Sequence, residues 1–266
     1  IKGLFGILQN LFIGKIYMSE FIAILTSTEI ILGVITFLTS VIAAVVGIGG
    51  GMMLIAILPS FLPLNALIPV HGLTQVSSNI SRAFFGYKDI QYEVIPKFLI
   101  GSVLGIGLFA GVLSFISLEY VLLFIGVYIL LSLWSEKFNE KIKRYENYYL
   151  AGFFQTGLSM VVGATGPLTM TLLFKDYEDK DKVVATGAAL MSITHLLKVV
   201  VFIYFGFVFF DFIWIIVAMI FGAVFGSFVG TKARNLIDGK KFTIILKTLL
   251  TILAIKLIVD IIIKVI

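Results

Sequence analysis

Long stretches of the chain are apolar on every side and are separated by short polar connections. They run from Ile30 to Leu62, Ala66 to Tyr87, Phe98 to Ile116, Tyr120 to Trp134, Tyr148 to Phe174, Val183 to Phe205, Phe212 to Gly230 and Phe242 to Ile263. A transmembrane barrel strand would alternate polar and apolar residues over about ten positions, whereas a helix needs about 20 apolar residues to cross a bilayer. The pattern predicts an all-α membrane protein.

Composition supports this fold class and excludes several kinds of site. The chain has 266 residues, of which 60% are hydrophobic and 13% charged. Its net charge of +5 comes mostly from basic residues in short connections, which membrane topology explains, so the lipid bilayer is expected as a partner and nucleic acid is not. Cysteine is absent and there are two histidines, so we expect no metal site and no cofactor.

Two glycine runs interrupt the first and fifth apolar stretches. They are Gly47-Ile48-Gly49-Gly50-Gly51 and Gly163-Ala164-Thr165-Gly166-Pro167. Only a few residues separate Pro167 from Lys175, and at about 1.5 Å per residue that arm is too short to cross a hydrocarbon core about 30 Å thick. The pattern predicts that each broken stretch forms a re-entrant helical hairpin with a glycine tip.

The distribution of basic residues favours the same interpretation. If both broken stretches were single crossings, the basic connections of the two halves would face opposite sides of the membrane, against the positive-inside rule. Two hairpins place nearly all of them on one side, which we assign to the cytoplasm. One hairpin plus three crossings is an odd number of passes, so the second half would be inverted relative to the first, as in many transporters.

This interpretation divides the chain into four parts. Residues 1–28 form an N-terminal interfacial segment, 29–135 the first membrane repeat, 136–147 a cytoplasmic linker of alternating charge and 148–266 the second membrane repeat. The repeats align without a gap from hairpin to following helix, with Gly47 on Gly163, Gly50 on Gly166, Asn79 on His195 and Arg82 on Lys198. Gly101 and Gly105 correspond to Gly222 and Gly226, and their spacing predicts close helix packing.

Polar residues share one face of the helix after each break. The first stripe comprises His71, Thr74, Gln75, Ser78, Asn79 and Arg82, and the second Thr186, Thr194, His195 and Lys198. Helix–helix hydrogen bonding explains isolated Ser and Thr residues in a bundle. His71 and His195 are candidates for proton coupling, or equally for neutral hydrogen-bond partners, and the sequence does not decide between these roles.

The two cations in these stripes have no evident counter-charge. A cation at the bilayer centre costs about 2.5 to 3.5 kcal/mol on the mildest scale. Lys198 lies deep in its stretch, whereas Arg82 is nearer an end and snorkelling explains it equally well. Asp260 is the one acidic residue inside an apolar run, and it is expected to pair with Lys256. A bound anion would supply the charge that Lys198 and Arg82 lack.

The glycine tips also suit an anion. A helix that begins at each break directs free N–H groups and its positive dipole end at the space between the repeats, where Thr165 adds a hydroxyl. The candidate substrate-binding residues are therefore Gly49, Gly50, Gly51, Asn79, Arg82, Thr165, Gly166, Thr194, His195 and Lys198.

From about Ile30 to Ile266 the chain resembles the TauE/SafE sulfite exporter family, also called the toluene sulfonate uptake permease family. The resemblance rests on a first span that ends in the triple-glycine run, the following helix, the basic connection and a degenerate second copy from Gly163 to Pro167. It implies a prokaryotic inner-membrane carrier of sulfite, sulfonates or related oxyanions, often proton-linked. The chain departs from the family pattern by lacking a proline soon after Gly51 and by keeping fewer glycines in the second copy.

The leading hypothesis is a secondary transporter of a small sulfur-containing oxyanion, not an enzyme, with a site between the two tips. A passive anion channel would share every electrostatic feature. A membrane-embedded enzyme would need paired carboxylates or a nucleophile with its base, and no buried acid orients either histidine. The sequence leaves open the oxyanion, the transport direction, the coupling ion and whether the chain forms a homo-oligomer.

Overall fold

The computed structural model describes residues 27–113, 115–143, 147–234, 236 and 239–265. The expected interfacial segment at residues 1–28 therefore lies almost wholly outside the described residues. Every regular element within those ranges is helical, which confirms the all-α prediction for them. The elements are α2 (Thr28–Val46), α3 (Gly50–Ile57), η1 (Leu58–Ser60), α4 (Leu64–Phe85), η2 (Tyr87–Asp89), η3 (Tyr92–Val94), α5 (Ile95–Leu113), η4 (Leu118–Tyr120), α6 (Val121–Trp134), α7 (Glu136–Lys143), α8 (Tyr148–Val162), α9 (Gly166–Asp176), α10 (Lys180–Tyr204), η5 (Phe209–Phe212), α11 (Ile213–Ala233) and α12 (Gly239–Val265).

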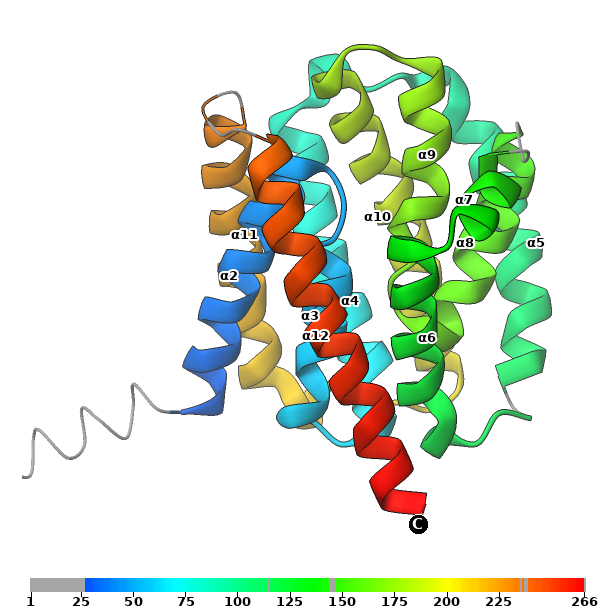
Figure 1. The fold of residues 1–266 in the computed structure, drawn as a ribbon, viewed down its shortest axis with the longest axis vertical. Helices are drawn as coiled ribbons and strands as arrows, with labels where there is room; N and C mark the ends of the chain where they lie inside the picture. Colours follow the sequence, from blue (N-terminus) through cyan, green and yellow to red (C-terminus); the bar gives the residue numbers. More distant parts are fainter. Residues whose placement is uncertain (1–26, 114, 144–146, 235, 237–238, 266) are drawn as a thin grey trace, which may run out of the picture.

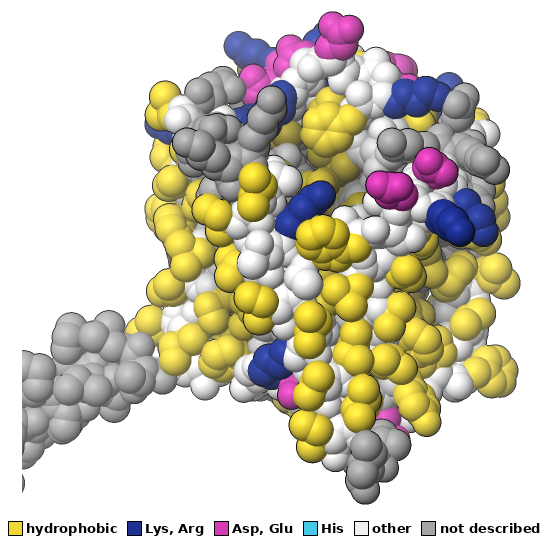
Figure 2. All heavy atoms as spheres, in the orientation of Figure 1, with side chains coloured by type: hydrophobic (Ala, Val, Ile, Leu, Met, Phe, Trp, Pro, Cys, Tyr) yellow, Lys and Arg dark blue, Asp and Glu magenta, His cyan; other side chains and the backbone are white. Residues whose placement is uncertain are grey.

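The surface is that of a multi-pass membrane protein. Among the described residues, four helical segments are long and apolar enough to cross a bilayer: Thr28–Val46, Tyr92–Leu113, Lys180–Tyr204 and Phe209–Ala233. Figure 2 shows hydrophobic side chains over most of the visible flank, whereas charged side chains gather at the end where α9 and α10 meet. Large side chains such as Tyr204 and Trp214 are 85% and 72% exposed, which suits contact with lipid.

Both glycine runs interrupt helices, as the sequence predicts. We call residues 47–51 the first tip and residues 163–167 the second tip. At the first tip, Gly47 and Gly49 adopt φ values of +91° and +94°, which L side chains rarely reach. Gly50 then lies against the carbonyl of Thr39 and the side chain of Ala43, so α3 starts beside the last turns of α2 rather than continuing them. At the second tip, Gly163 has φ +77°, and α9 begins with Pro167 in its first turn.

The long helices pack in matching pairs. Helix α2 runs along α11 and α8 along α5, α4 crosses α10, and α6 lies beside α12 (Figure 1). A Cβ added to Gly222 or Gly226 would collide with the α2 backbone at Gly33 or Phe37. A Cβ added to Gly101 or Gly105 would collide with the α8 backbone at Tyr149 or Phe153. The close packing predicted from these four glycines is confirmed.

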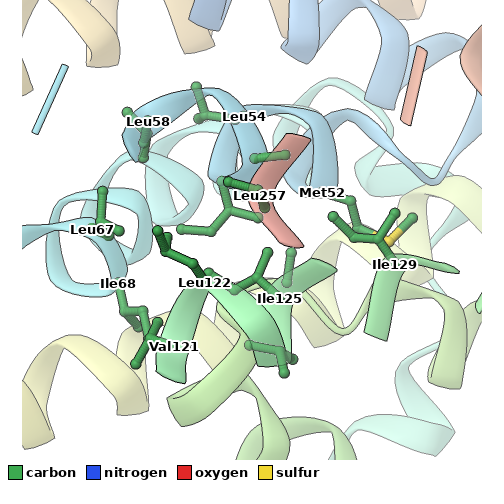
Figure 3. Close-up of a cluster of buried hydrophobic side chains, with 14 of the residues drawn as sticks. Met52, Leu54, Leu58, Leu67, Ile68, Val121, Leu122, Ile125, Ile129 and Leu257 are labelled. Atoms are coloured by element: carbon green, nitrogen blue, oxygen red, sulfur yellow. The ribbon is translucent and has the colours of Figure 1, made fainter. Parts of the chain in front are cut away.

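An apolar cluster holds α3 in the bundle. Figure 3 shows Met52 beside Ile129 of α6, in one cluster with Leu54, Leu58 and Leu257 on α12. Leu54, Leu58 and Leu257 have no exposed surface. Because lipid is as apolar as leucine, this cluster stabilises α3 through van der Waals packing rather than through exclusion of water. The packing fixes where the first tip points.

Polar contacts join the elements at the charged end. The Tyr177 hydroxyl donates to Glu93 Oε1 at 2.7 Å, and the Tyr148 hydroxyl donates to Asp176 Oδ2 at 2.7 Å. Partial burial and the bond to Glu93 raise the pKa of Tyr177 to about 12, so its phenol remains a donor at neutral pH. The linker between the two expected repeats carries the helix α7.

Candidate functional site: a cavity between the two glycine tips

A cavity of about 40 Å³ lies between the two tips. Its lining comes from both tips and from one face each of α4 and α10; the residues are Ala43, Gly47, Ile48, Gly49, Gly50, Gly51, Met52, Gln75, Asn79, Arg82, Ala164, Thr165, Gly166, Pro167, Gly187, Met191 and His195. A buried water needs about 10 to 15 Å³, so the space suits a few waters or one small ion. Among the expected site residues, Thr194 and Lys198 do not line it.

The polar stripe of α4 serves two purposes. All six of its members are buried. Ser78 Oγ lies 3.0 Å from Ser40 Oγ, and the Thr74 hydroxyl faces Met219 Sδ at 3.8 Å, so these two residues join α4 to its neighbours. Gln75, Asn79 and Arg82 instead line the cavity.

Arg82 is buried in the protein rather than snorkelling, with 4% of its surface exposed. Its Nη1 donates to the Ala43 carbonyl at 3.0 Å and its Nη2 to Asn79 Oδ1 at 2.8 Å. Asn79 in turn donates to the Gln75 carbonyl at 2.7 Å, which fixes its amide. The third donor of the guanidinium, Nε, is buried with no partner in the described part of the chain.

A second buried arginine, Arg234, meets the same end of α2. Its Nε donates to the Ala44 carbonyl at 2.8 Å, and its Nη1 pairs with Asp181 Oδ1 at 2.5 Å. The carbonyls at a helix C-terminus carry partial negative charge, so they stabilise both guanidinium groups. The sequence interpretation missed Arg234 because it follows α11, where a basic residue is explained by topology alone.

Lys198 is fully buried and bonds to the second tip. Its Nζ donates to the Gly163 carbonyl at 2.7 Å, and Gly72 on α4 leaves room for its stem. The absence of a carboxylate partner, expected from the sequence, holds across the residues that the structure describes. The carbonyl at the end of α8 supplies part of the compensation that was expected from a bound anion.

Gln155 on α8 organises the second tip. Its backbone carbonyl accepts the Thr165 hydroxyl at 2.8 Å, and its Oε1 accepts the Thr169 N–H at 3.1 Å and the Thr169 hydroxyl. Its Nε2 donates to Thr194 Oγ1 at 3.3 Å, so Thr194 belongs to the contact between α8 and α10. Sequence analysis missed Gln155, although a lone amide in an apolar stretch is a signal that could have identified it.

The two histidines meet where α4 crosses α10. Their ring centroids are 5.6 Å apart and the rings are edge to face. His71 Nε2 lies 3.0 Å from the Gly51 carbonyl, which can only accept, so Nε2 carries the proton. The Nδ1 atoms of both rings are buried and have no partner among the described residues. His195 lines the cavity and His71 supports the first tip from behind.

The chemistry of the cavity suits an anion. Its lining contains one guanidinium and no carboxylate. The first turn of α3 has no side-chain cap, and Gly49, at its start, has no side chain that could provide one. Within the described ranges, no group of three or more His, Cys, Asp or Glu side chains could hold a metal ion.

Comparison with known families gives a match over most of the chain. The model of a family described as sulfite exporter TauE/SafE matches residues 32–257 of the 266, which confirms the resemblance seen in the glycine runs. Comparison with curated proteins and with solved structures finds no match.

Proposed function

The chain belongs to the TauE/SafE sulfite exporter family, and from that premise we propose that it is a secondary transporter of a small sulfur-containing oxyanion such as sulfite or an organosulfonate. The observation that carries the proposal is the cavity between the tips, which combines glycine backbone, a buried guanidinium and no carboxylate. Such a site binds a small anion through backbone N–H groups and one fixed cation.

The pattern of contacts supports two inverted repeats. The pairing of α2 with α11 has its equivalent in the pairing of α8 with α5, and α4 meets α10 at the centre. The cations that the alignment matches also bond near matching helix ends, Arg82 to Ala43 at the end of α2 and Lys198 to Gly163 at the end of α8. In the proposal each tip belongs to a re-entrant hairpin, and the second repeat is upside down relative to the first.

This architecture fits alternating access across the cytoplasmic membrane, with the basic connections on the cytoplasmic side. One repeat or bundle would move against the other around the fixed site between the tips. His195 in the cavity wall and His71 in contact with it are the groups that a proton-linked cycle would use.

Flux through reconstituted protein tests the proposal. We expect proteoliposomes to take up radiolabelled sulfite faster than empty liposomes, with saturation and with acceleration by sulfite on the opposite side. The variant Lys256→Ala serves as the matched control, because this exposed lysine pairs with Asp260 on the surface. Uptake equal to that of empty liposomes would refute transport of sulfite, and uptake that rises linearly without counterflow would identify a channel.

A further inference from the structure

We propose that the two tips have different tasks: the anion binds to the first tip through the N-terminus of α3 and Arg82, whereas Lys198 positions the second tip and does not contact the anion. This inference rests on the proposed anion transport and adds which residues hold the anion. It departs from the symmetry of the fold, which would assign Lys198 the role of Arg82.

The first tip retains donors. The first N–H groups of a helix have no acceptor within it, and no side chain caps α3 at Gly49. Met53 N–H is the first of the helix to find an acceptor, the Gly49 carbonyl at 2.8 Å. Arg82 Nε is buried without a partner among the described residues, and the Arg82 side chain lines the same cavity. The proposal therefore assigns this guanidinium N–H and the first backbone N–H groups of α3 to the anion.

At the second tip the corresponding donors are used within the protein. Pro167 has no N–H, Leu168 N–H donates to the Thr165 carbonyl at 3.1 Å, and Thr169 N–H donates to Gln155 Oε1. The Thr165 hydroxyl donates a hydrogen bond to the Gln155 carbonyl. Among the described residues no acceptor is found for the Gly166 N–H, which leaves this one backbone donor of the first turn for a ligand. The second tip therefore forms a wall of the site rather than a donor cluster.

Lys198 contacts the second tip but does not line the cavity. Its Nζ is bonded to the Gly163 carbonyl, and the side chain is absent from the cavity lining. A cation at the C-terminal end of α8 stabilises the helix end at which the chain turns into the second tip. Lys198 thus fixes the position of residues 163–167, whereas Arg82 has a donor left to offer.

Equilibrium binding of sulfite to purified protein in detergent separates the two tasks. We expect Arg82→Gln and Arg82→Lys each to raise the Kd at least about tenfold, because a charge-assisted hydrogen bond contributes about that factor. Arg82→Lys keeps the charge, but one ammonium cannot replace three guanidinium donors. Lys198→Met is expected to keep the Kd within about threefold of wild type while lowering the thermal unfolding midpoint.

Thr165→Val tests the second tip with a milder change. It removes the hydroxyl of a residue that lines the cavity, and because that hydroxyl is bonded to the Gln155 carbonyl we expect the Kd for sulfite to remain within about threefold of wild type. A tenfold loss in Thr165→Val or Lys198→Met, or wild-type affinity in both Arg82 variants, would overturn the division between the tips.

Binding measurements with a panel of inorganic anions distinguish a failure of this inference from a failure of the proposed function. If the wild type binds phosphate or selenite but not sulfite, and the Arg82 variants lose that binding, the first-tip site stands and the sulfur substrate does not. If the wild type binds none of the anions, both proposals are refuted.

Discussion

Buried cations in this chain are compensated by helix carbonyls. Arg82 and Arg234 donate to Ala43 and Ala44 at the end of α2, and Lys198 donates to Gly163 at the end of α8. Partial negative charge at a helix C-terminus stabilises a nearby cation, by up to about 2 kcal/mol in partly buried geometries. A buried cation without a carboxylate partner therefore does not by itself mark a ligand site. The donors that each cation has left distinguish a ligand-binding residue from a positioning residue.

The sharpest test of the first tip at the level of one residue is Gly50→Ala. The added Cβ would collide with the carbonyl of Thr39 and crowd Ala43, and backbone atoms cannot move aside as a flexible side chain can. We expect a loss of about 1 to 3 kcal/mol or more in stability, measured as a lower thermal unfolding midpoint in detergent.

Gly107→Ala is the matched control for that substitution. Gly107 lies in α5 with nothing within 4 Å of an added Cβ, so we expect no loss and a gain of up to about 1 kcal/mol. Equal unfolding midpoints for the two variants would mean that α3 does not pack against α2 as described.

The sequence could predict the polar stripe of α4, the glycine tips and the ion pair between Lys256 and Asp260. In the structure, Lys256 Nζ lies 2.7 Å from Asp260 Oδ2. These features depend on local spacing along one helix. Arg234 and Gln155 could not be recognised in the same way, because their partners lie on α2, α9 and α10. Which residue of a matched pair faces the cavity also depends on packing. The sequence therefore led us to expect both Arg82 and Lys198 there, although Lys198 is not part of the lining.

At the level of the element, two arginines from distant parts of the chain donate hydrogen bonds to carbonyls at the end of α2. Arg82 comes from α4, and Arg234 follows α11 and also pairs with Asp181 at the start of α10. Helix α2 thus stops beside the first tip with the carbonyls of Ala43 and Ala44 bonded to arginine side chains. Hydropathy alone could find α2 and α11, but it does not place α4 among the four long apolar segments, because the polar stripe lowers the hydropathy of that helix.

Substitution of one arginine tests how much these bonds to the end of α2 contribute to the stability of the protein. We expect Arg234→Met to lose about 1.5 to 3 kcal/mol, because the Ala44 carbonyl loses a charge-assisted bond inside the protein. Lys232→Met is the matched control on the same helix, since that lysine is exposed and contacts only the ring face of Phe228 among the interactions found for it. Chemical denaturation in mixed micelles measures both variants. If the two lose equal stability, the contact with α2 contributes nothing beyond a surface charge.

At the scale of the whole molecule, helix packing is close to symmetric while the chemistry of the two tips is not. The pairs α2–α11 and α8–α5 match, yet the second tip is bonded internally through Gln155 and the first tip is not capped. In transporters built from inverted repeats, one repeat or bundle moves against the other around a fixed site. In the proposed transporter, unequal tips would let one conformation hold the anion at fixed donors while the other half of the site moves.

The native chain lacks cysteine, so single cysteines can report on which side of the membrane each connection lies. We choose four exposed positions, in the variants Ser117→Cys, Glu140→Cys, Glu178→Cys and Val208→Cys. With two re-entrant hairpins, an impermeant maleimide added to intact cells should label positions 117 and 208, while 140 and 178 should react only after permeabilisation. The reason is that α8 and α9 together return the chain to the side from which it entered, which leaves the basic connections in the cytoplasm. If the second broken stretch crossed the membrane once, positions 140 and 178 would react from opposite sides, and so would 117 and 208. That result would refute the inverted repeat.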